Sequence, residues 1–301
     1  MGMNRTALRR ALLRVLARLP VPMRQAATPP RILLIRPDHL GDLLFMTPAL
    51  HRLRMAVPAA HIACLVGPWA APILANNPDL DEVLTCDFPW FDRRPKTFPW
   101  SPYRVLWREA ARLRARRFDV AMVQRFDFWW GAALARLAGI PRRIGYDLPD
   151  VEPFLTVAVA YAQGLHEVEQ NARLVEAAIA SLYPPFPSLG RGEGEQGDRG
   201  EDLGPLRFTI SADDRAWANQ RLPDGPLVAI HAGAGAPVKL WDAGRWVEVA
   251  TELRRRLGVV IVLTGGATEV ALVQSIGSKL NVPNHVVAGE TSLGQLAAVF
   301  A

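Results

Sequence analysis

A polar segment directly after the first apolar stretch carries a carboxylate that is suitable for proton transfer. Residues 31–36 are largely apolar and predict a buried strand, and Gly41 and Asp42 follow at the start of a predicted helix. Ligands of α/β sheets bind outside the carboxyl ends of strands, and a glycine there lets a ligand approach the backbone. The local pattern leaves two interpretations of Asp42 open: a general base facing a ligand, or the cap of the helix.

Three further turns, each after a predicted strand, contain residues that suit phosphate. His231 ends the apolar run 227–231, and a loop of small residues containing Gly233 leads from it to Lys239. Loop amides and a compact ammonium group can hold a phosphate, although the Gly-Lys-Ser/Thr of a Walker A loop is absent. The other two turns contain Thr264, Gly265 and Gly266, and Thr291 and Ser292. Their strand-to-helix geometry favours anions, but Ser292 is equally typical of a plain N-cap.

Polar residues also follow later strands of the first half. Gln124 and Arg125 come after the predicted strand 118–123, and we expect them at the same rim as Asp42, because the carboxyl ends of parallel strands share one edge. Arg143 begins the predicted strand 143–145, where it either meets an acceptor phosphate or belongs to a solvated turn. Trp241 and Trp246, just after the Lys239 loop, are expected to pack in the core.

Predicted strands and helices alternate along the chain, which is typical of parallel sheets joined by helical crossovers. In the first half we predict strands at 31–36, 61–66, 82–86, 118–123 and 143–145, with helices up to 56 and at 69–76, 103–116, 128–138 and 166–182. The dipeptide Thr47-Pro48 is expected to cap or kink the first helix. In the second half we predict strands at 227–231, 259–263 and 285–288, with helices at 243–257, 268–280 and from 292 onward. Residues 184–205, rich in proline and glycine, predict a flexible linker between two domains.

The order of these motifs resembles glycosyltransferase family 9, the heptosyltransferase-like family. The likeness rests on ILLIR, Gly41-Asp42 and TPAL at 47–50 in the first half, and on 231–241 and GETSL at 289–293 in the second. It covers residues 31–182 and 206–301. It implies an α/β protein of GT-B architecture, with two Rossmann-like domains whose parallel sheets face a cleft. The implied order is a leader at 1–30, an acceptor-side domain at 31–183, the linker, and a nucleotide-sugar-binding domain at 206–301.

The resemblance also implies a role for each motif. Asp42 takes the position of the family's general base, and Lys239 lies in the segment that contacts the phosphates of the nucleotide-sugar. Ala232 stands where the family usually has proline. The implied donor-side residues are Lys239, His231, Gly233, Thr264, Gly265, Gly266, Thr291 and Ser292, and the implied acceptor-side residues are Gly41, Gln124, Arg125 and Arg143.

The reaction implied by the resemblance is an inverting transfer of a heptose or a related sugar to a lipopolysaccharide core or another lipid-linked glycan. The donor is a nucleotide-sugar, ADP-heptose in the first instance, and it is a substrate, so neither a cofactor nor a metal ion is expected. The family's Asp-Ser-Gly-Pro-x-His segment does not occur before Ala301, and the second domain is therefore expected to be incomplete. The alternative is a truncated, non-catalytic protein that binds the acceptor or a partner.

Net charge and the leader indicate where the protein acts. The formal charge is +6, and six arginines without an acid lie in the first thirty residues. Apolar residues recur at helical spacing in the stripe Leu8, Ala11, Leu12, Val15, Leu16 and Leu19. This spacing predicts a basic amphipathic helix on a membrane surface, or else a helix packed on the body of the protein or on a partner. Nucleic acid is not an expected partner, because no recognised binding motif is present and the arginines lack interleaved aromatics. Two cysteines, Cys64 and Cys86, read as buried thiols. We expect a cytoplasmic protein, peripheral at the inner face of the cytoplasmic membrane.

Overall fold

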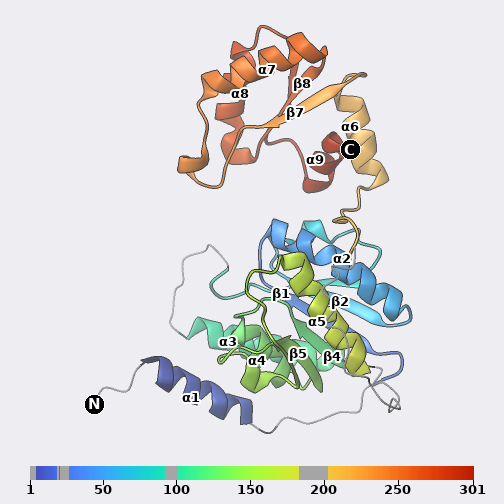
Figure 1. Ribbon diagram of the computed structural model, residues 1–301, viewed down its shortest axis with the longest axis vertical. Helices are drawn as coiled ribbons and strands as arrows, with labels where there is room; N and C mark the ends of the chain where they lie inside the picture. The colour runs from blue at the N-terminus through green and yellow to red at the C-terminus, as the bar shows by residue number, and fades with distance from the viewer. Residues whose placement is uncertain (1–4, 19, 21–26, 92–99, 183–202) are drawn as a thin grey trace. The chain divides into compact units, whose positions relative to one another are not determined.

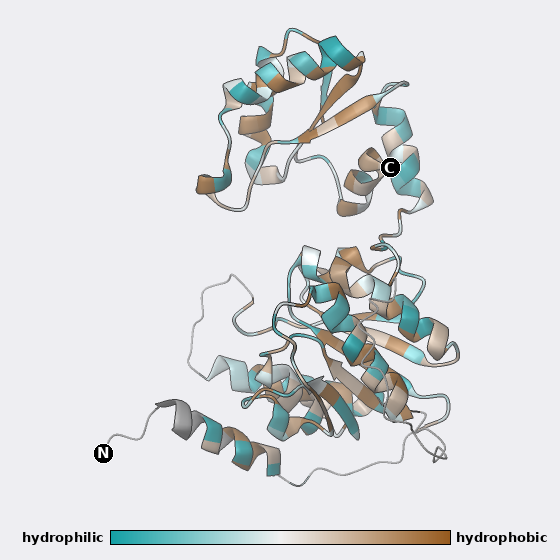
Figure 2. Ribbon diagram, viewed as in Figure 1, coloured by the Kyte–Doolittle hydropathy of each residue, from teal (hydrophilic) through white to brown (hydrophobic). Residues whose placement is uncertain are grey.

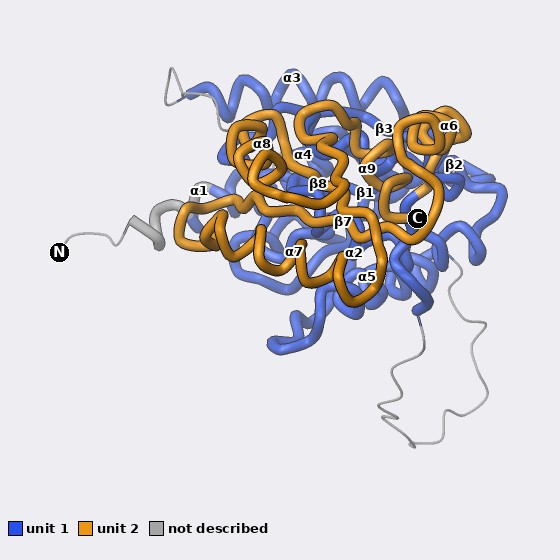
Figure 3. The backbone as a smooth tube through the Cα atoms, turned by 90° about the horizontal axis from the view of Figure 1, so that it is seen from above, with its two compact units in different colours: residues 1–208 blue, residues 209–301 orange. Residues whose placement is uncertain are grey.

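The computed structural model describes residues 5–18, 20, 27–91, 100–182 and 203–301, and it forms two compact units (Figure 3). Unit 1 comprises residues 1–208 and unit 2 residues 209–301. Of the predicted linker at 184–205, only the last three residues lie within the described part of the chain. Each unit is built on its own parallel sheet.

A six-stranded parallel sheet forms the centre of unit 1 (Figure 1). Its order is β3-β2-β1-β4-β5-β6. The strands are β1 Arg31–Arg36, β2 His61–Val66, β3 Glu82–Thr85, β4 Val120–Val123, β5 Arg142–Tyr146 and β6 Val157–Val159. Because β1 pairs with β2 on one side and with β4 on the other, the winding of the sheet reverses between β1 and β4. In open α/β sheets such a switch point is where ligands bind.

Helices cover both faces of this sheet (Figure 1). Helices α2 Leu40–Ala56 and α5 Glu167–Leu182 pack together on one face, and α3 Ser101–Arg116 and α4 Trp129–Leu137 pack together on the other. Strands enclosed in this way must be apolar on both faces, and five of the six residues of β1 are buried. In Figure 2 the central strands are coloured mainly as hydrophobic residues.

The proline predicted to cap or kink the first helix lies inside α2. Pro48 has no N–H, so the carbonyl of Leu44, four residues earlier, loses its usual helical donor. The hydroxyl of Thr47 replaces that donor with a hydrogen bond of 2.7 Å to the Leu44 oxygen. Thr47 also accepts a hydrogen bond from the backbone N–H of Arg207. The Thr-Pro pair therefore continues the helix and links it to the end of unit 1.

The leader forms helix α1, Arg5–Arg18, and it packs on unit 1. Leu13 is buried in the core of that unit, with Leu16 and Ala17 packed beside it, whereas Val15 is exposed. Arg10 forms an ion pair of 3.2 Å with Asp150. The second interpretation of the leader therefore describes this helix better, and its buried face is centred on Leu13, which the predicted apolar stripe did not include.

Unit 2 contains a three-stranded parallel sheet of order β7-β8-β9. The strands are β7 Leu227–His231, β8 Val260–Thr264 and β9 Asn284–Val286, and the helices are α6 Ala212–Arg221, α7 Ala243–Leu257, α8 Val270–Lys279 and α9 Leu293–Phe300. Helix α7 packs on α8, and α6 packs on α9. The hydrophobic core lies between β8 and the pair α7 and α8. Trp246 packs in this core as predicted, while Trp241 is exposed and contacts the Trp246 ring edge-on.

Three elements differ from the sequence-based expectation. The predicted helix at 69–76 is only a short 3-10 turn, Ala71–Ile73. The described residues also form such turns at Glu152–Phe154, Pro237–Lys239 and Ala267–Glu269. Strand β6 was not predicted, because three residues are too short to show an alternating pattern. Helix α6 was not predicted because it is polar on most sides, although Ser211 and Asp214 form the capping box that marks its start.

Both cysteines are free and buried, as predicted. Burial raises the pKa of the Cys64 thiol to about 12, and it raises that of Cys86 as well. Within the described ranges, no helix is both long enough and apolar enough to cross a bilayer.

Candidate functional site

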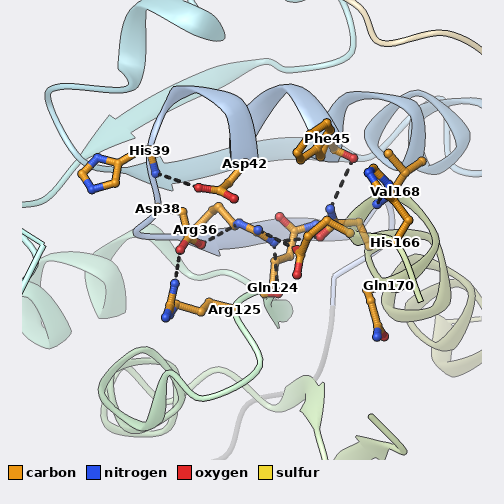
Figure 4. Close-up of polar contacts among 12 residues, drawn as sticks. Arg36, Asp38, His39, Asp42, Phe45, Gln124, Arg125, His166, Val168 and Gln170 are labelled. Atoms are coloured by element: carbon orange, nitrogen blue, oxygen red, sulfur yellow. Dashed lines mark hydrogen bonds and ion pairs between the residues drawn. The ribbon is translucent and has the colours of Figure 1, made fainter. Parts of the chain in front are cut away.

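A buried arginine organises the polar cluster at the carboxyl ends of β1 and β4 (Figure 4). Arg36 ends β1, and its Nη1 donates to the Gln124 backbone oxygen at 3.1 Å and to Asn171 Oδ1 at 2.9 Å. Its Nη2 donates to Glu167 Oε2 at 2.9 Å. This one guanidinium therefore holds together β1, the end of β4 and the first turns of α5.

Asp38 extends the cluster toward the surface. Its Oδ2 lies 2.7 Å from Arg36 Nε, within ion-pair distance but not aligned as a hydrogen bond, and its Oδ1 pairs with Arg125. Arg125 also bonds Asp127 at 2.7 Å and lies over the Phe91 ring. Burial alone would lower the pKa of Arg125, but the carboxylates of Asp38 and Asp127 outweigh it and raise that pKa. The rim thus contains two cations, Arg36 and Arg125, that share the buried carboxylate of Asp38.

Asp42 lies in the first turn of α2, beside this cluster (Figure 4). Its Oδ2 accepts a hydrogen bond from the His39 backbone N–H at 3.3 Å, so it does cap the helix. Its Oδ1 has no hydrogen-bond partner among the described residues, and the side chain is half-buried. Asp42 can therefore be both a helix cap and a general base, because Oδ2 accepts the His39 N–H while Oδ1 remains able to accept a proton.

Gly41 precedes Asp42 and is exposed. A Cβ atom built at Gly41 would have no atom within 4 Å, so packing within the protein does not require a glycine there. A glycine at this position leaves room for a ligand from outside the chain to approach the backbone closely. This geometry is consistent with the predicted acceptor contact of Gly41.

Gln124 is buried at the switch point with an unused side-chain amide. It is only 2% exposed, and neither its Nε2 nor its Oε1 hydrogen-bonds to any described residue. A buried amide without partners is costly, and a native protein usually supplies an ordered water or a ligand for it. The contact between Gln124 and the acceptor therefore stays a prediction, and the buried amide without partners is the physical reason for it.

Arg143 has a different environment from the one predicted for it. It is buried near the amino end of β5, away from the carboxyl ends where ligands bind. Its Nε donates to the Phe154 oxygen at 2.6 Å, and its Nη1 donates to the oxygens of Ile140 and Pro141 at 2.6 and 3.0 Å. Burial lowers the pKa of Arg143 to about 10. We therefore assign Arg143 to the packing of these turns and not to the acceptor.

These two buried side chains allow one sharp prediction. We expect Gln124→Leu to leave the free energy of unfolding unchanged or slightly higher, because leucine replaces an amide that bonds to no described residue. If the amide contacts the acceptor, its loss should raise the acceptor KM about fivefold, the value of roughly one neutral hydrogen bond. Urea unfolding and an acceptor titration measure the two quantities separately.

Arg143→Met is the matched control. It should lower the free energy of unfolding by about 1–3 kcal/mol, because three carbonyls lose their donor, and it should leave the acceptor KM unchanged. An acceptor KM that rises with Arg143→Met and not with Gln124→Leu would reverse the two assignments.

In unit 2, the ends of β7 and β8 bring predicted donor-side residues together. His231 Nδ1 lies 3.1 Å from Thr264 Oγ1, and His231 Nε2 lies 3.7 Å from Glu269 Oε2. The same Glu269 oxygen accepts the backbone N–H of Gly266 at 2.6 Å. A phosphate oxygen reaches this N–H only if Glu269 turns away.

Glycines let the loops of this unit approach one another closely. A Cβ atom at Gly233 would lie 1.8 Å from the Glu269 carboxylate, so no other residue fits there without displacing it. The N–H of Gly289 donates to the Gly265 oxygen at 2.9 Å, which joins the turn after β8 to the turn that contains Thr291. The predicted residues His231, Gly233, Thr264, Gly265 and Gly266 therefore lie together.

Ser292 and Lys239 lie in different surroundings. Ser292 is the N-cap of α9, with its hydroxyl accepting the Gln295 N–H at 3.1 Å, so the structure favours the cap interpretation of this serine. Lys239 ends the short turn Pro237–Lys239 and is exposed, and it forms no ion pair with a described residue. Its ammonium group is thus available to an anionic ligand.

The sequence indicated the rim but assigned no role to the residues that hold it. Glu167 and Asn171 are the partners of Arg36, and they lie on α5, more than 130 positions away in the chain. His166, just before α5, accepts the Val168 N–H, as expected for a helix cap. The available signal was a polar Asn171 at helical spacing with the apolar residues Leu174 and Val175. Across the described ranges, no group of three or more His, Cys, Asp or Glu residues is arranged to hold a metal ion.

Similarity to solved structures identifies the fold of this chain. The chain resembles the glycosyl transferase family 9 protein of Veillonella parvula with a TM-score of 0.71 and 23% identity, over 92% of this chain and 75% of that one. It also resembles the E. coli ADP-heptose LPS heptosyltransferase II, with a TM-score of 0.66 and 21% identity, over 89% of this chain and 76% of that one. The predicted α/β fold of GT-B type, with Rossmann-like parallel sheets, is thereby confirmed.

The sequence comparison gives the family. Residues 106–301 match the sequence model of glycosyltransferase family 9 (heptosyltransferase), and the chain belongs to this family. It is therefore a glycosyltransferase. Lipopolysaccharide heptosyltransferase 2 of Salmonella typhimurium is 25% identical over 297 residues, which cover 90% of this chain and 74% of that protein.

Proposed function

We propose that this glycosyltransferase moves a heptose from ADP-heptose to a lipopolysaccharide core or another lipid-linked glycan, with inversion and without a metal ion. The names of its relatives support the two substrates, since one is a lipopolysaccharide heptosyltransferase and another an ADP-heptose LPS heptosyltransferase. The observation that carries the mechanism is the carboxylate of Asp42. It lies directly beyond β1, and its Oδ1 accepts no hydrogen bond from a described residue.

In the proposed reaction the oxygen of an acceptor hydroxyl attacks the anomeric carbon of the donor sugar. A new C–O bond forms as the bond between that carbon and the diphosphate oxygen breaks, and ADP leaves with the electron pair. Asp42 takes the proton of the attacking hydroxyl, which keeps positive charge from accumulating on its oxygen. Gly41, Gln124 and Arg125 are the proposed acceptor contacts around this base.

The charge that develops on the leaving diphosphate requires fixed donors and cations. Lys239 supplies an exposed ammonium group, and the turn Thr264–Gly266 supplies backbone groups at the end of β8. His231, Gly233, Thr291 and Ser292 complete the proposed donor side, with Ser292 acting mainly as a helix cap. The proposed place of action is the inner face of the cytoplasmic membrane, because a lipid-linked acceptor is held there.

A transfer assay tests the proposal. The purified protein is incubated with ADP-heptose and a heptose-deficient lipopolysaccharide, with UDP-glucose as the control donor and EDTA in a parallel reaction. We expect the acceptor to gain the mass of one heptosyl residue only with ADP-heptose, with equal yield in EDTA. Binding of the acceptor without transfer from either donor would favour the alternative, a non-catalytic acceptor-binding protein. Loss of activity in EDTA would contradict the metal-independent mechanism.

A further inference from the structure

A broad aromatic groove lies on the α3 side of unit 1, apart from the polar cluster except at Arg125 and Asp127. Its volume is about 940 Å³. Its lining includes Leu13 and Leu16 of α1, Trp90, Trp100 at the start of α3, and Tyr103 and Trp107 of α3, and most of the wall is apolar. We call these six residues the aromatic groove.

The side chains around the groove are unusually exposed for their type. Trp100 is 73% exposed and Trp107 is 52% exposed, and Trp90 and Tyr103 are exposed as well. These four are half of the eight exposed large apolar side chains among the described residues of unit 1, the others being Val15, Met55, Leu165 and Leu206. Tryptophan and tyrosine have an apolar body and a polar tip, and they gather where hydrocarbon meets water.

Exposed arginines lie on the two helices that line the groove. Arg14 and Arg18 lie on α1 and Arg104 on α3, and none of the three forms an ion pair with a described residue. The acids nearby are already engaged, since Glu109 is buried against Arg108 and Arg112, and Asp127 pairs with Arg125. The surface is therefore apolar at its centre and positively charged at its edges.

We propose that the aromatic groove and its arginines form a docking surface for the interfacial region of an anionic bilayer. The ring tips and arginines would meet phosphate headgroups while the ring bodies lie at the acyl boundary. Helix α1 contributes a wall and two cations and does not insert, because Leu13 and Leu16 already pack on unit 1. The inference deepens the proposed function, on which it rests for the lipid-linked acceptor, because docking places that acceptor beside Arg125.

Flotation of the full-length protein with vesicles tests this surface. We expect binding to phosphatidylcholine vesicles that contain about one-third phosphatidylglycerol, and little binding to phosphatidylcholine alone. The double variant Trp100→Ser, Trp107→Ser should lower the partition coefficient about tenfold or more, and Arg104→Gln about fivefold. Trp241→Ser, an exposed tryptophan in unit 2, is the matched control and should bind like the parent protein. All four side chains are exposed, so circular dichroism should be unchanged.

The outcomes separate this inference from the proposed function. Equal vesicle binding by the double variant would overturn the docking surface, and so would a parent protein that binds neither vesicle. A parent dimer that the double variant converts to a monomer, seen by light scattering, would show that a second copy covers the groove and would also overturn it. A deacylated, water-soluble acceptor isolates the chemistry: the double variant should turn it over normally, while its rate on vesicle-bound acceptor falls. A parent protein that binds vesicles but turns over no acceptor would contradict the proposed function and leave the docking surface standing.

Discussion

Asp42→Asn should lower kcat by about 10²-fold or more, the usual loss when a positioned general base is removed. Asparagine keeps an oxygen that can accept the His39 N–H, so the start of α2 should remain capped. The free energy of unfolding and the acceptor affinity should therefore change little. The measurements are the initial rate of ADP release at saturating substrates, urea unfolding, and acceptor binding by calorimetry.

A second carboxylate at a helix start controls for the change of charge. Asp213 is exposed in the first turn of α6, so Asp213→Asn removes the same charge from a comparable position outside the candidate site. It should leave kcat unchanged. If Asp42→Asn also retains full kcat, Asp42 is a cap only and another group takes the proton. If Asp42→Asn unfolds the protein, Asp42→Glu, which keeps the carboxylate, should retain fold and partial activity.

Lys239→Met should lower kcat/KM for the nucleotide-sugar by about 10- to 100-fold, because a charge-assisted bond to phosphate contributes roughly 1.5–3 kcal/mol. Methionine keeps much of the aliphatic stem, and Lys239 is exposed with no described ion-pair partner, so the fold should be unaffected. The loss should shrink as salt is added, because ions screen the attraction of the parent protein for the donor. Donor titrations at two ionic strengths measure both effects.

Lys279→Met is the control, since Lys279 is an exposed lysine at the end of α8. It should leave the donor kinetics unchanged while altering the net charge by the same amount. Donor kinetics that are identical in the two variants would remove Lys239 from the donor site and leave the turn Thr264–Gly266 as the remaining anion site.

The class of fold was predictable from the sequence because its signal is local. A strand enclosed by helices on both faces must be apolar throughout, and the runs 31–36, 61–66 and 227–231 each became a strand with those bounds. The position of Asp42 was equally readable, since a residue that follows such a strand by a short turn lies at the carboxyl edge of the sheet. Short or polar elements carry no such signal, which is why β6 and α6 were missed.

Interactions between distant parts of the chain were decided only by the tertiary structure. The sequence did not distinguish the half-buried Arg125 at the rim from the buried Arg143, because the groups that surround a guanidinium come from segments distant in the chain. The partners of Arg36 on α5 and the burial of Leu13 of α1 against the core of unit 1 have the same origin. Periodicity reports which residues share one face of an element, but only packing determines whether that face meets protein, solvent or a membrane. For this protein, the sequence by itself determined the α/β plan and the place of its carboxylate, and the fold decided which charges remain available to a ligand.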